Sequence, residues 1–333
     1  MENLEEQVPV VEDKLQQKIS LAIEEIKKVV VGQEYMINRL LIGLFTNGHI
    51  LLEGMPGLAK TLTVNTLANV LDLGFQRIQF TPDLLPSDLV GTMIYNQQKS
   101  EFEVKKGPIF SNIVLADEVN RSPAKVQAAL LESMAEKQVT IGDTTYKLDR
   151  PFLVLATQNP IDQEGTYELP EAQVDRFLMK VKVDYPDKAS ELEVMRRMSN
   201  LSFKAETKQI LSKTEIMQIK DAVNDVHLEE SLEHYIIDLV FASRNSKSSE
   251  YNLGKMGEYL EIGVSPRASI GVNLAAKAYA YIAGRNYVLP DDIQEVLKDV
   301  FGHRLVLNYE AEADGITPEM VVDKLKEVVP VNK

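Results

Sequence analysis

The segment GMPGLAKT, residues 54–61, decides the fold of this chain of 333 residues. It matches the phosphate-loop pattern G-x-x-x-x-G-K-[ST] except that Ala59 stands where the pattern has glycine. An apolar run at 49–53 precedes the segment, and a helical pattern begins near Lys60. A glycine-containing loop between a strand and a helix presents backbone N–H groups to a phosphate at the positive end of the helix. The alternative is an ordinary strand–turn–helix with a surface lysine. Residues elsewhere in the chain are needed to distinguish the two interpretations.

The side chains of this segment suit a bound nucleotide. Lys60 would place its ammonium on the β- and γ-phosphates, and the Thr61 hydroxyl would hold Mg²⁺. Gly54 and Gly57 supply tight turns, and Pro56 stiffens the loop. These roles require a sheet behind the loop and acidic residues beside it.

The pattern around the segment predicts an α/β domain. Short apolar runs alternate with helical segments from residue 49 to about 184, and three of the runs are almost continuously apolar. Such runs are typical of strands buried on both faces of a parallel sheet, so we expect a three-layer α/β core. Outside this alternation, 139–148 is predicted as a hairpin that turns at Gly142-Asp143, and 87–110 can form another near Asn96 to Ser100. The predicted core strands are 49–53, 75–80, 112–117, 151–157 and 177–183.

Helical periodicity precedes and follows this core. Residues 14–29 and the segment between Gly32 and Asn47-Gly48 predict two helices at the start of the chain. After Pro186 helical patterns dominate, without a convincing strand. We therefore predict a nucleotide-binding core at 1–186 and a smaller all-α domain at 187–333. The helices predicted in the second domain are 187–200, 214–226, 231–244, 267–284 and 290–300.

The composition excludes several classes of protein. Lys and Arg total 36 against 50 Asp and Glu, and the formal net charge of -14 argues against a general binder of nucleic-acid backbones. Absence of cysteine excludes disulfides and thiolate metal sites. No apolar run approaches the ~20 residues that a membrane helix needs, and the acidic start lacks the features of a signal peptide. We expect a cytoplasmic protein without membrane insertion.

Acidic and amide side chains follow two of the predicted strands. Asp117 and Glu118 come directly after the run at 112–117, at the strand edge where α/β sheets bind ligands. Asp117 can hold Mg²⁺, and Glu118 is spaced to accept a proton from an attacking water. Asn159 follows the next strand and could orient that water, although Asn159-Pro160 alone is an ordinary turn signal. Together with the phosphate loop, these residues favour a site of nucleotide hydrolysis.

Two arginines complete the set. Arg176 follows Asp175 just before the fifth predicted strand, and Arg267 opens a predicted helix of the second domain. Each arginine alone is more typical of a surface ion pair than of a catalytic group. Their combination with the phosphate loop, the carboxylates and Asn159 makes a catalytic role more favourable for both arginines.

The order of the motifs VVGQE, GMPGLAKT, ADEVNRSPAKVQAALLESMAE, ATQNP, LPEAQVDRF and SPRA resembles the MoxR family of AAA+ ATPases. The resemblance extends from about Val30 to the 290s. Members of this family are similar in carrying alanine at the Ala59 position, so the departure from glycine is expected there. We also expect that Ala59, at the start of a helix, needs no positive φ.

The resemblance implies a role for each position. Glu118 resembles the catalytic base and Asn159 resembles sensor 1. Arg176 resembles the arginine finger, which reaches the nucleotide of the neighbouring subunit, and Arg267 resembles sensor 2, which acts from the lid domain. The segment 87–110 looks like the helix-2 insert, and 139–148 like the pre-sensor-1 hairpin. The implied Mg²⁺ ligands are Thr61 and Asp117. The implied ATP-binding residues are Val31, Gly32, Gln33, Gly54, Met55, Pro56, Gly57, Leu58, Ala59, Lys60, Thr61, Leu62 and Asp117.

The resemblance implies an ATP-driven chaperone or remodeller that works as a ring, expected to be a hexamer. Its implied partners are von Willebrand factor A domain proteins, for complex assembly or metal insertion. A nucleic-acid motor is the alternative, hinted at by Lys99, Lys105 and Lys106 but offset by the intervening Glu101 and Glu103. A nucleotide-binding scaffold without hydrolysis is a third interpretation, which the intact set of polar residues disfavours.

Overall fold

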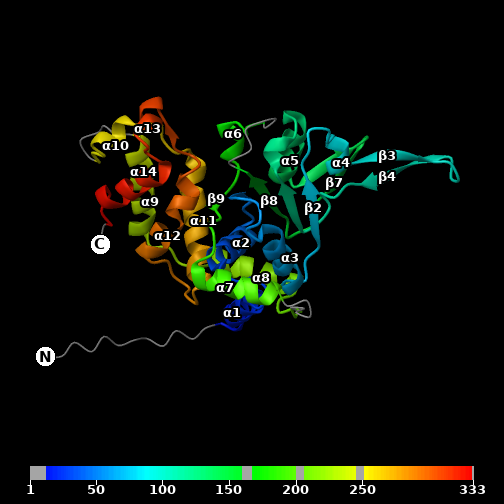
Figure 1. The fold of residues 1–333 in the computed structure, drawn as a ribbon, viewed down its shortest axis with the longest axis horizontal. Helices are drawn as coiled ribbons and strands as arrows, with labels where there is room; N and C mark the ends of the chain where they lie inside the picture. Colours follow the sequence, from blue (N-terminus) through cyan, green and yellow to red (C-terminus); the bar gives the residue numbers. More distant parts are fainter. Residues whose placement is uncertain (1–12, 160–166, 200–205, 245–250, 332–333) are drawn as a thin grey trace.

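The computed structural model describes residues 13–159, 167–199, 206–244 and 251–331. Within these ranges, five strands form one sheet in the order β2-β5-β8-β1-β9, and all neighbouring strands are parallel (Figure 1). The five predicted core strands are confirmed. They are β1 (Ile50–Glu53), β2 (Phe75–Gln79), β5 (Ile113–Asp117), β8 (Leu153–Gln158) and β9 (Met179–Lys182).

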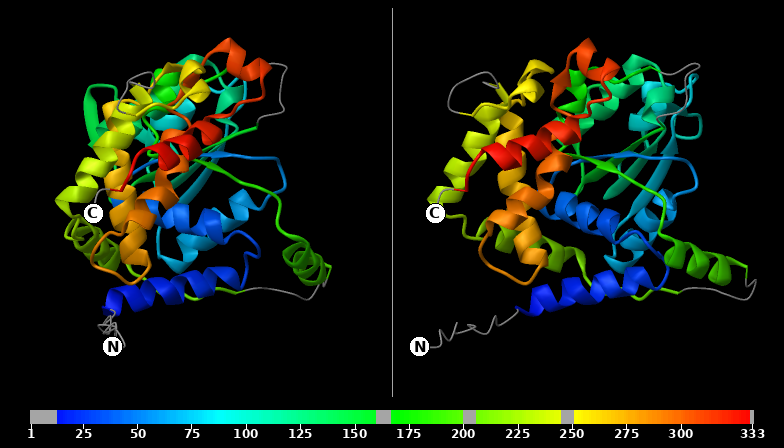
Figure 2. Two further views of the ribbon diagram at one scale, coloured as in Figure 1. Left: turned by 90° about the vertical axis from the view of Figure 1, so that its left-hand side faces the viewer. Right: turned by 60° about the vertical axis from the view of Figure 1, so that its left-hand side comes forward.

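The sheet is covered on both faces. On β1, Ile50 and Leu52 belong to one hydrophobic cluster, whereas Leu51 belongs to another. Because successive side chains of a strand point to opposite faces, the two clusters lie on opposite sides of the sheet, which confirms the three-layer core (Figure 2). The first cluster includes residues of α1 (Lys14–Lys27), α2 (Glu34–Thr46) and α3 (Lys60–Val70), and the second includes residues of α5 (Ala124–Glu136).

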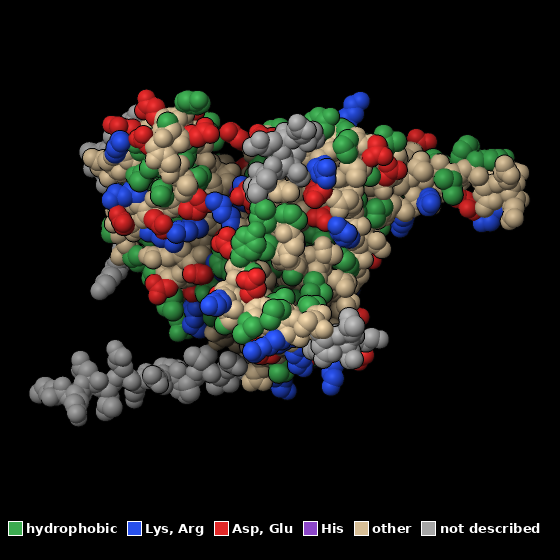
Figure 3. Space-filling model, in the orientation of Figure 1, with side chains coloured by type: hydrophobic (Ala, Val, Ile, Leu, Met, Phe, Trp, Pro, Cys, Tyr) green, Lys and Arg blue, Asp and Glu red, His purple; other side chains and the backbone are tan. Residues whose placement is uncertain are grey.

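Two antiparallel hairpins stand outside the sheet, as predicted. The first joins β3 (Gly91–Asn96) to β4 (Glu101–Lys106) and follows the short helix α4 (Pro86–Val90). The second joins β6 (Gln138–Ile141) to β7 (Thr144–Lys147). The β3–β4 hairpin projects from the body of the molecule, and apolar side chains gather on its surface (Figure 3). The exposed apolar residues on it are Met93, Ile94, Tyr95 and Phe102.

The second half of the chain is helical, as predicted, but it also contains three helices and a pair of strands that were not predicted. A short sheet pairs β10 (Leu260–Ile262) with β11 (Val306–Leu307), and neither strand was predicted. Within the described residues, every helix is too short or too polar to cross a bilayer. The boundary between 186 and 187 falls in the loop after β9 and stays a prediction. The helices are α7 (Lys188–Met198), α8 (Lys213–Asn224), α9 (Glu230–Arg244), α10 (Lys255–Glu258), α11 (Pro266–Ile282), α12 (Pro290–Phe301), α13 (Tyr309–Ala313) and α14 (Pro318–Val328). Three of these, α10, α13 and α14, were not predicted.

A buried charge pair ties the helical half to the core. Arg39 of α2 donates from Nε to Asp299 of α12 at 2.8 Å and from Nη2 to the Glu295 carboxylate at 2.9 Å. The Arg39 side chain is almost fully buried, so these contacts satisfy a guanidinium that would otherwise be costly to remove from water. The lid therefore contacts the core through the ion pairs of a buried arginine as well as through a shared hydrophobic cluster.

Candidate functional site

The loop at 54–61 lines a cavity of about 340 Å³ at the carboxyl edge of the sheet. Three further segments reach the same cavity: the ends of β5 and β8, and the edge strand β2. The sequence therefore predicted correctly that the loop and the polar strand ends meet. The lining residues are Gly54, Pro56, Gly57, Leu58, Ala59, Lys60, Thr61, Leu62, Arg77, Asp117, Glu118, Thr157 and Asn159. Met55, in contrast, packs against the hydrophobic core.

The loop has the geometry of an anion-binding turn. A Cβ on Gly54 would lie 2.6 Å from the Val183 carbonyl oxygen, and Gly57 has a φ of +89°. Lys60 donates from Nζ to the Gly54 carbonyl at 2.7 Å. Burial lowers the pKa of Lys60, and the carboxylates of Asp117 and Glu118 oppose that shift. The ammonium is thus held inside the loop, beside two acidic groups.

Ala59 departs from the expectation made for it. Its backbone is left-handed, with φ 56° and ψ 18°, so the expectation that this position needs no positive φ is wrong. The residue is the N-cap of α3, and its carbonyl accepts from the Thr63 backbone N–H at 2.8 Å and the Thr63 hydroxyl at 3.0 Å. The helix thereby holds the loop in a conformation that costs an L-residue roughly 1–2 kcal/mol.

Replacing Ala59 with glycine is expected to raise the free energy of unfolding by about 1 kcal/mol, because glycine adopts this φ without steric cost. Urea titration with a common m-value measures the change. Ala59→Val is the opposite control, since a β-branched residue at positive φ should lower stability. A glycine variant less stable than the native protein would contradict the left-handed conformation.

The ends of β5 and β8 are joined through one hydroxyl. Thr157 donates to Asp117 Oδ1 at 2.6 Å, and its oxygen accepts from the Glu118 backbone N–H at 2.8 Å. Glu118 itself has a φ of 58°, which is uncommon for a residue with a side chain and is typical of functional sites. Thr157 therefore holds the carboxylate of Asp117 and the backbone of Glu118.

Two residues of β2 contact these carboxylates, and the sequence analysis missed both. Arg77 donates to Asp117 Oδ2 from Nε at 3.0 Å and from Nη2 at 2.6 Å. Gln79 donates from Nε2 to Glu118 Oε2 at 2.8 Å, and Arg121 donates to the same oxygen at 3.1 Å. Because Arg77 and Gln79 are two residues apart on a strand, they share a face, which was the available signal.

The donor set fits Mg²⁺. Thr61 and Asp117 supply a hydroxyl and a carboxylate oxygen to one cavity, and Mg²⁺ is usually held by one or two such groups together with phosphate oxygens. Among the described residues, no cluster of three or more His, Cys, Asp or Glu could hold a metal by itself. The site therefore suits a cation that is shared with a bound phosphate.

Some of the implied ATP-binding residues line a second cavity, of about 340 Å³. Gly32 and Gln33 belong to it, and Gln33 donates from Nε2 to the Asp184 carbonyl at 3.3 Å. Val31 is half-buried beside them. A third cavity shares Asn159 with the phosphate-loop cavity and Lys180 with the second. The third cavity therefore adjoins both of the others.

The two predicted arginines lie elsewhere. Arg176 is exposed in a shallow groove beside α5, with Nη1 at 3.5 Å from the Leu131 carbonyl. Arg267 is half exposed, and its Nη1 lies 3.4 Å from Asp175 Oδ2. The described lining of the phosphate-loop cavity includes neither side chain. Within one subunit, the structure does not bring these two residues to the predicted phosphate position.

Comparison with known proteins agrees with this geometry. The family model described as "ATPase family associated with various cellular activities (AAA)" matches residues 49–179, and the AAA lid domain model matches residues 256–325. Chaperone MoxR1 of Mycobacterium tuberculosis is 47% identical over 92% of this chain and 81% of its own length. Protein MoxR of Paracoccus denitrificans is 33% identical over 91% of this chain and 93% of its own length. A crystal structure from Cytophaga hutchinsonii, described as a candidate ATPase, has a TM-score of 0.91 at 62% identity over 96% of both chains. The chain belongs to the MoxR family of AAA+ ATPases.

Proposed function

We propose that this protein hydrolyses ATP and uses the cycle to remodel partner proteins. The observation that carries the proposal is the convergence of Lys60, Asp117, Glu118 and Asn159 on one cavity behind a phosphate loop. Family membership supports the ATPase half of the proposal, and similarity to Chaperone MoxR1, at 47% identity, supports the remodelling half.

The loop and its lysine bind the phosphates. Backbone N–H groups at the start of α3 face the cavity, and Lys60 adds its ammonium there. When bound, Mg²⁺ neutralises charge on the β- and γ-phosphate oxygens, and Thr61 and Asp117 would hold it. Arg77 donates two hydrogen bonds to Asp117 Oδ2 and so fixes the carboxylate that would hold the metal.

Glu118 acts as the general base. Its contacts with Gln79 and Arg121 both end on Oε2, so we assign Oε1 to the attacking water. The carboxylate takes a proton as the water oxygen bonds to the γ-phosphorus and the bond to the bridging oxygen breaks. Asn159 lines the same cavity and would orient the water through its amide.

Arg176 completes the site of a neighbouring subunit. Its exposure and its distance from its own phosphate-loop cavity support a role in trans. Sensor 2, Arg267, would act on its own subunit's nucleotide after leaving Asp175. These roles require a ring, for which we propose a hexamer, with von Willebrand factor A domain proteins as the partners. The structure offers little for a nucleic-acid motor, since Lys99 in the projecting hairpin is paired with Glu103 at 2.5 Å.

Activity measured against protein concentration tests the proposal. ATP hydrolysis per subunit should rise steeply over the range in which light scattering detects ring assembly, because Arg176 supplies transition-state charge only between subunits. Constant activity per subunit across that range would exclude the role in trans. For the remodelling half, rings trapped with ATP by Glu118→Gln should retain a client protein that the native ring releases; if none is retained, remodelling is contradicted.

A further inference from the structure

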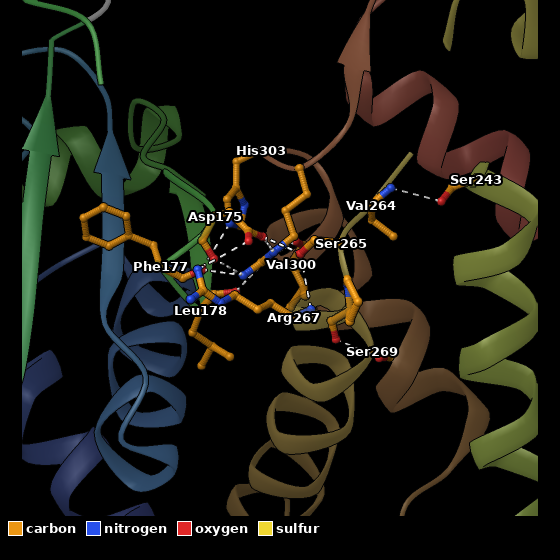
Figure 4. A network of polar contacts seen from close by, with 12 residues as sticks. Asp175, Phe177, Leu178, Ser243, Val264, Ser265, Arg267, Ser269, Val300 and His303 are labelled. Carbon is orange, nitrogen blue, oxygen red and sulfur yellow. Dashed lines mark hydrogen bonds and ion pairs between the residues drawn. The ribbon is translucent and has the colours of Figure 1, made fainter. Parts of the chain in front are cut away.

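A buried arginine of the lid holds the chain segment that carries Arg176. Arg304 follows α12, and only 7% of its surface is exposed. Its guanidinium donates to Asp175 Oδ1 at 2.8 Å and to the backbone carbonyls of Asp175 at 3.1 Å and Phe177 at 2.6 Å (Figure 4). Arg304 therefore binds the backbone on both sides of Arg176.

Further contacts make this a rigid clamp. Arg304 Nη1 donates to the Leu178 carbonyl at 3.1 Å and to the Val300 carbonyl of the preceding helix α12. The planar guanidinium has five donors in a fixed fork, so several acceptors can be held in one geometry. Phe177 and Leu178 are themselves buried. The position of Arg176 is thus set relative to α12, an element of the lid.

The carboxylate beside Arg176 also faces the start of α11. Asp175 Oδ1 accepts from the Ser265 hydroxyl at 2.7 Å, and Asp175 Oδ2 lies 3.4 Å from Arg267 Nη1. Figure 4 shows Ser265 and Arg267 beside Asp175, to which Arg304 also donates a hydrogen bond. Side chains at the start of α11 and after the end of α12 therefore both bind Asp175, the residue that precedes Arg176.

We propose that Arg304 is a positioning residue for Arg176, through which the lid of one subunit sets the arginine offered to the next subunit. The inference rests on the proposed role of Arg176 in trans. Arg304 is not among the described residues that line the phosphate-loop cavity. Movement of the lid with α12 carries Arg304, and with it the backbone at 175–178.

Mixed rings distinguish this role from a purely structural one. Arg304→Lys keeps the positive charge but loses the planar set of guanidinium donors. A ring made only of this variant should hydrolyse ATP roughly 10²-fold more slowly, the cost of misplacing Arg176 by about an ångström. Affinity for a fluorescent ATP analogue should stay unchanged, because the variant's own cavity is intact. Rings assembled from equal amounts of Arg304→Lys and Glu118→Gln should recover at least about tenfold, since the inactive subunits donate a correctly placed Arg176.

Three controls accompany the experiment. Arg176→Ala mixed with Glu118→Gln should recover in the same way, whereas Arg267→Ala, which acts on its own subunit, should not. Arg285→Lys removes a different guanidinium, which donates two hydrogen bonds to the Asp292 carboxylate inside the lid, at 2.7 and 2.6 Å. This matched variant should hydrolyse ATP at the native rate per folded ring.

The outcomes separate the inference from the proposed function. Two results would overturn the inference alone. One is native ATPase activity of Arg304→Lys. The other is that Glu118→Gln subunits restore the activity of Arg176→Ala but do not restore the activity of Arg304→Lys. Failure of Arg176→Ala to recover overturns the role of Arg176 in trans, and the inference with it. If Arg304→Lys does not fold, as judged by thermal unfolding, Asp175→Asn carries the same test, because it weakens the clamp while keeping the side-chain shape.

Discussion

Replacing Arg176 by alanine is expected to lower ATP hydrolysis by the assembled ring roughly 10³–10⁵-fold, the contribution of an arginine supplied in trans to phosphoryl transfer. The side chain is exposed, and its contact with the protein is a weak one, to the Leu131 carbonyl at 3.5 Å. Its removal should therefore leave folding, ring assembly and ATP affinity unchanged. Steady-state hydrolysis with saturating ATP, together with nucleotide binding, measures the two effects separately.

A control arginine makes this result specific. Arg196 is exposed on α7 and is not among the described residues that line the phosphate-loop cavity, so Arg196→Ala should hydrolyse ATP at the native rate. A loss of ATP affinity in Arg176→Ala that matches its loss of rate would contradict the assignment, because it would place the side chain in its own subunit's binding site.

Glu118→Gln is expected to lower the rate of hydrolysis roughly 10²–10⁴-fold, the usual contribution of a general base. Glutamine has the same shape, and its amide oxygen can still accept from Gln79 and Arg121, so the site should keep its geometry. ATP should therefore stay bound and uncleaved. Single-turnover hydrolysis in a quenched reaction measures the chemical step directly, and filtration of the ring measures the nucleotide retained.

The matched control for this variant is Glu312→Gln, which neutralises an exposed carboxylate of α13 in the lid. It should leave the single-turnover rate unchanged. If Glu118→Gln cleaved ATP at the native rate, the proton would have to be taken by another group, and the assignment of Glu118 as the base would fail.

The sequence predicted the sheet because its central strands are buried on both faces. β5 and β8 lie in the middle of the sheet, so their residues are almost continuously apolar until the strand ends. The carboxyl ends of parallel strands share one edge, and this rule alone placed Asp117, Glu118 and Asn159 beside the phosphate loop. The prediction succeeded where strand burial and topology decide position.

The parts that the sequence did not predict depend on tertiary contacts. Arg304 binds carbonyl groups 126 to 129 residues earlier in the chain, and a single buried arginine leaves no periodic signal. Arg77 looks like an ordinary polar residue of an edge strand until Asp117 is placed beside it. The left-handed backbone of Ala59 is imposed by the loop and α3, against the local preference of alanine.

The projecting β3–β4 hairpin has a consequence for motion. Its two strands pair with each other and not with the five-stranded sheet, and an isolated two-stranded hairpin is only marginally stable in water. Opening its outer half therefore requires far less free energy than global unfolding, and its amide hydrogens should exchange with solvent sooner than those of β5 or β8. The hairpin can consequently reshape around a partner while the nucleotide cavity stays intact.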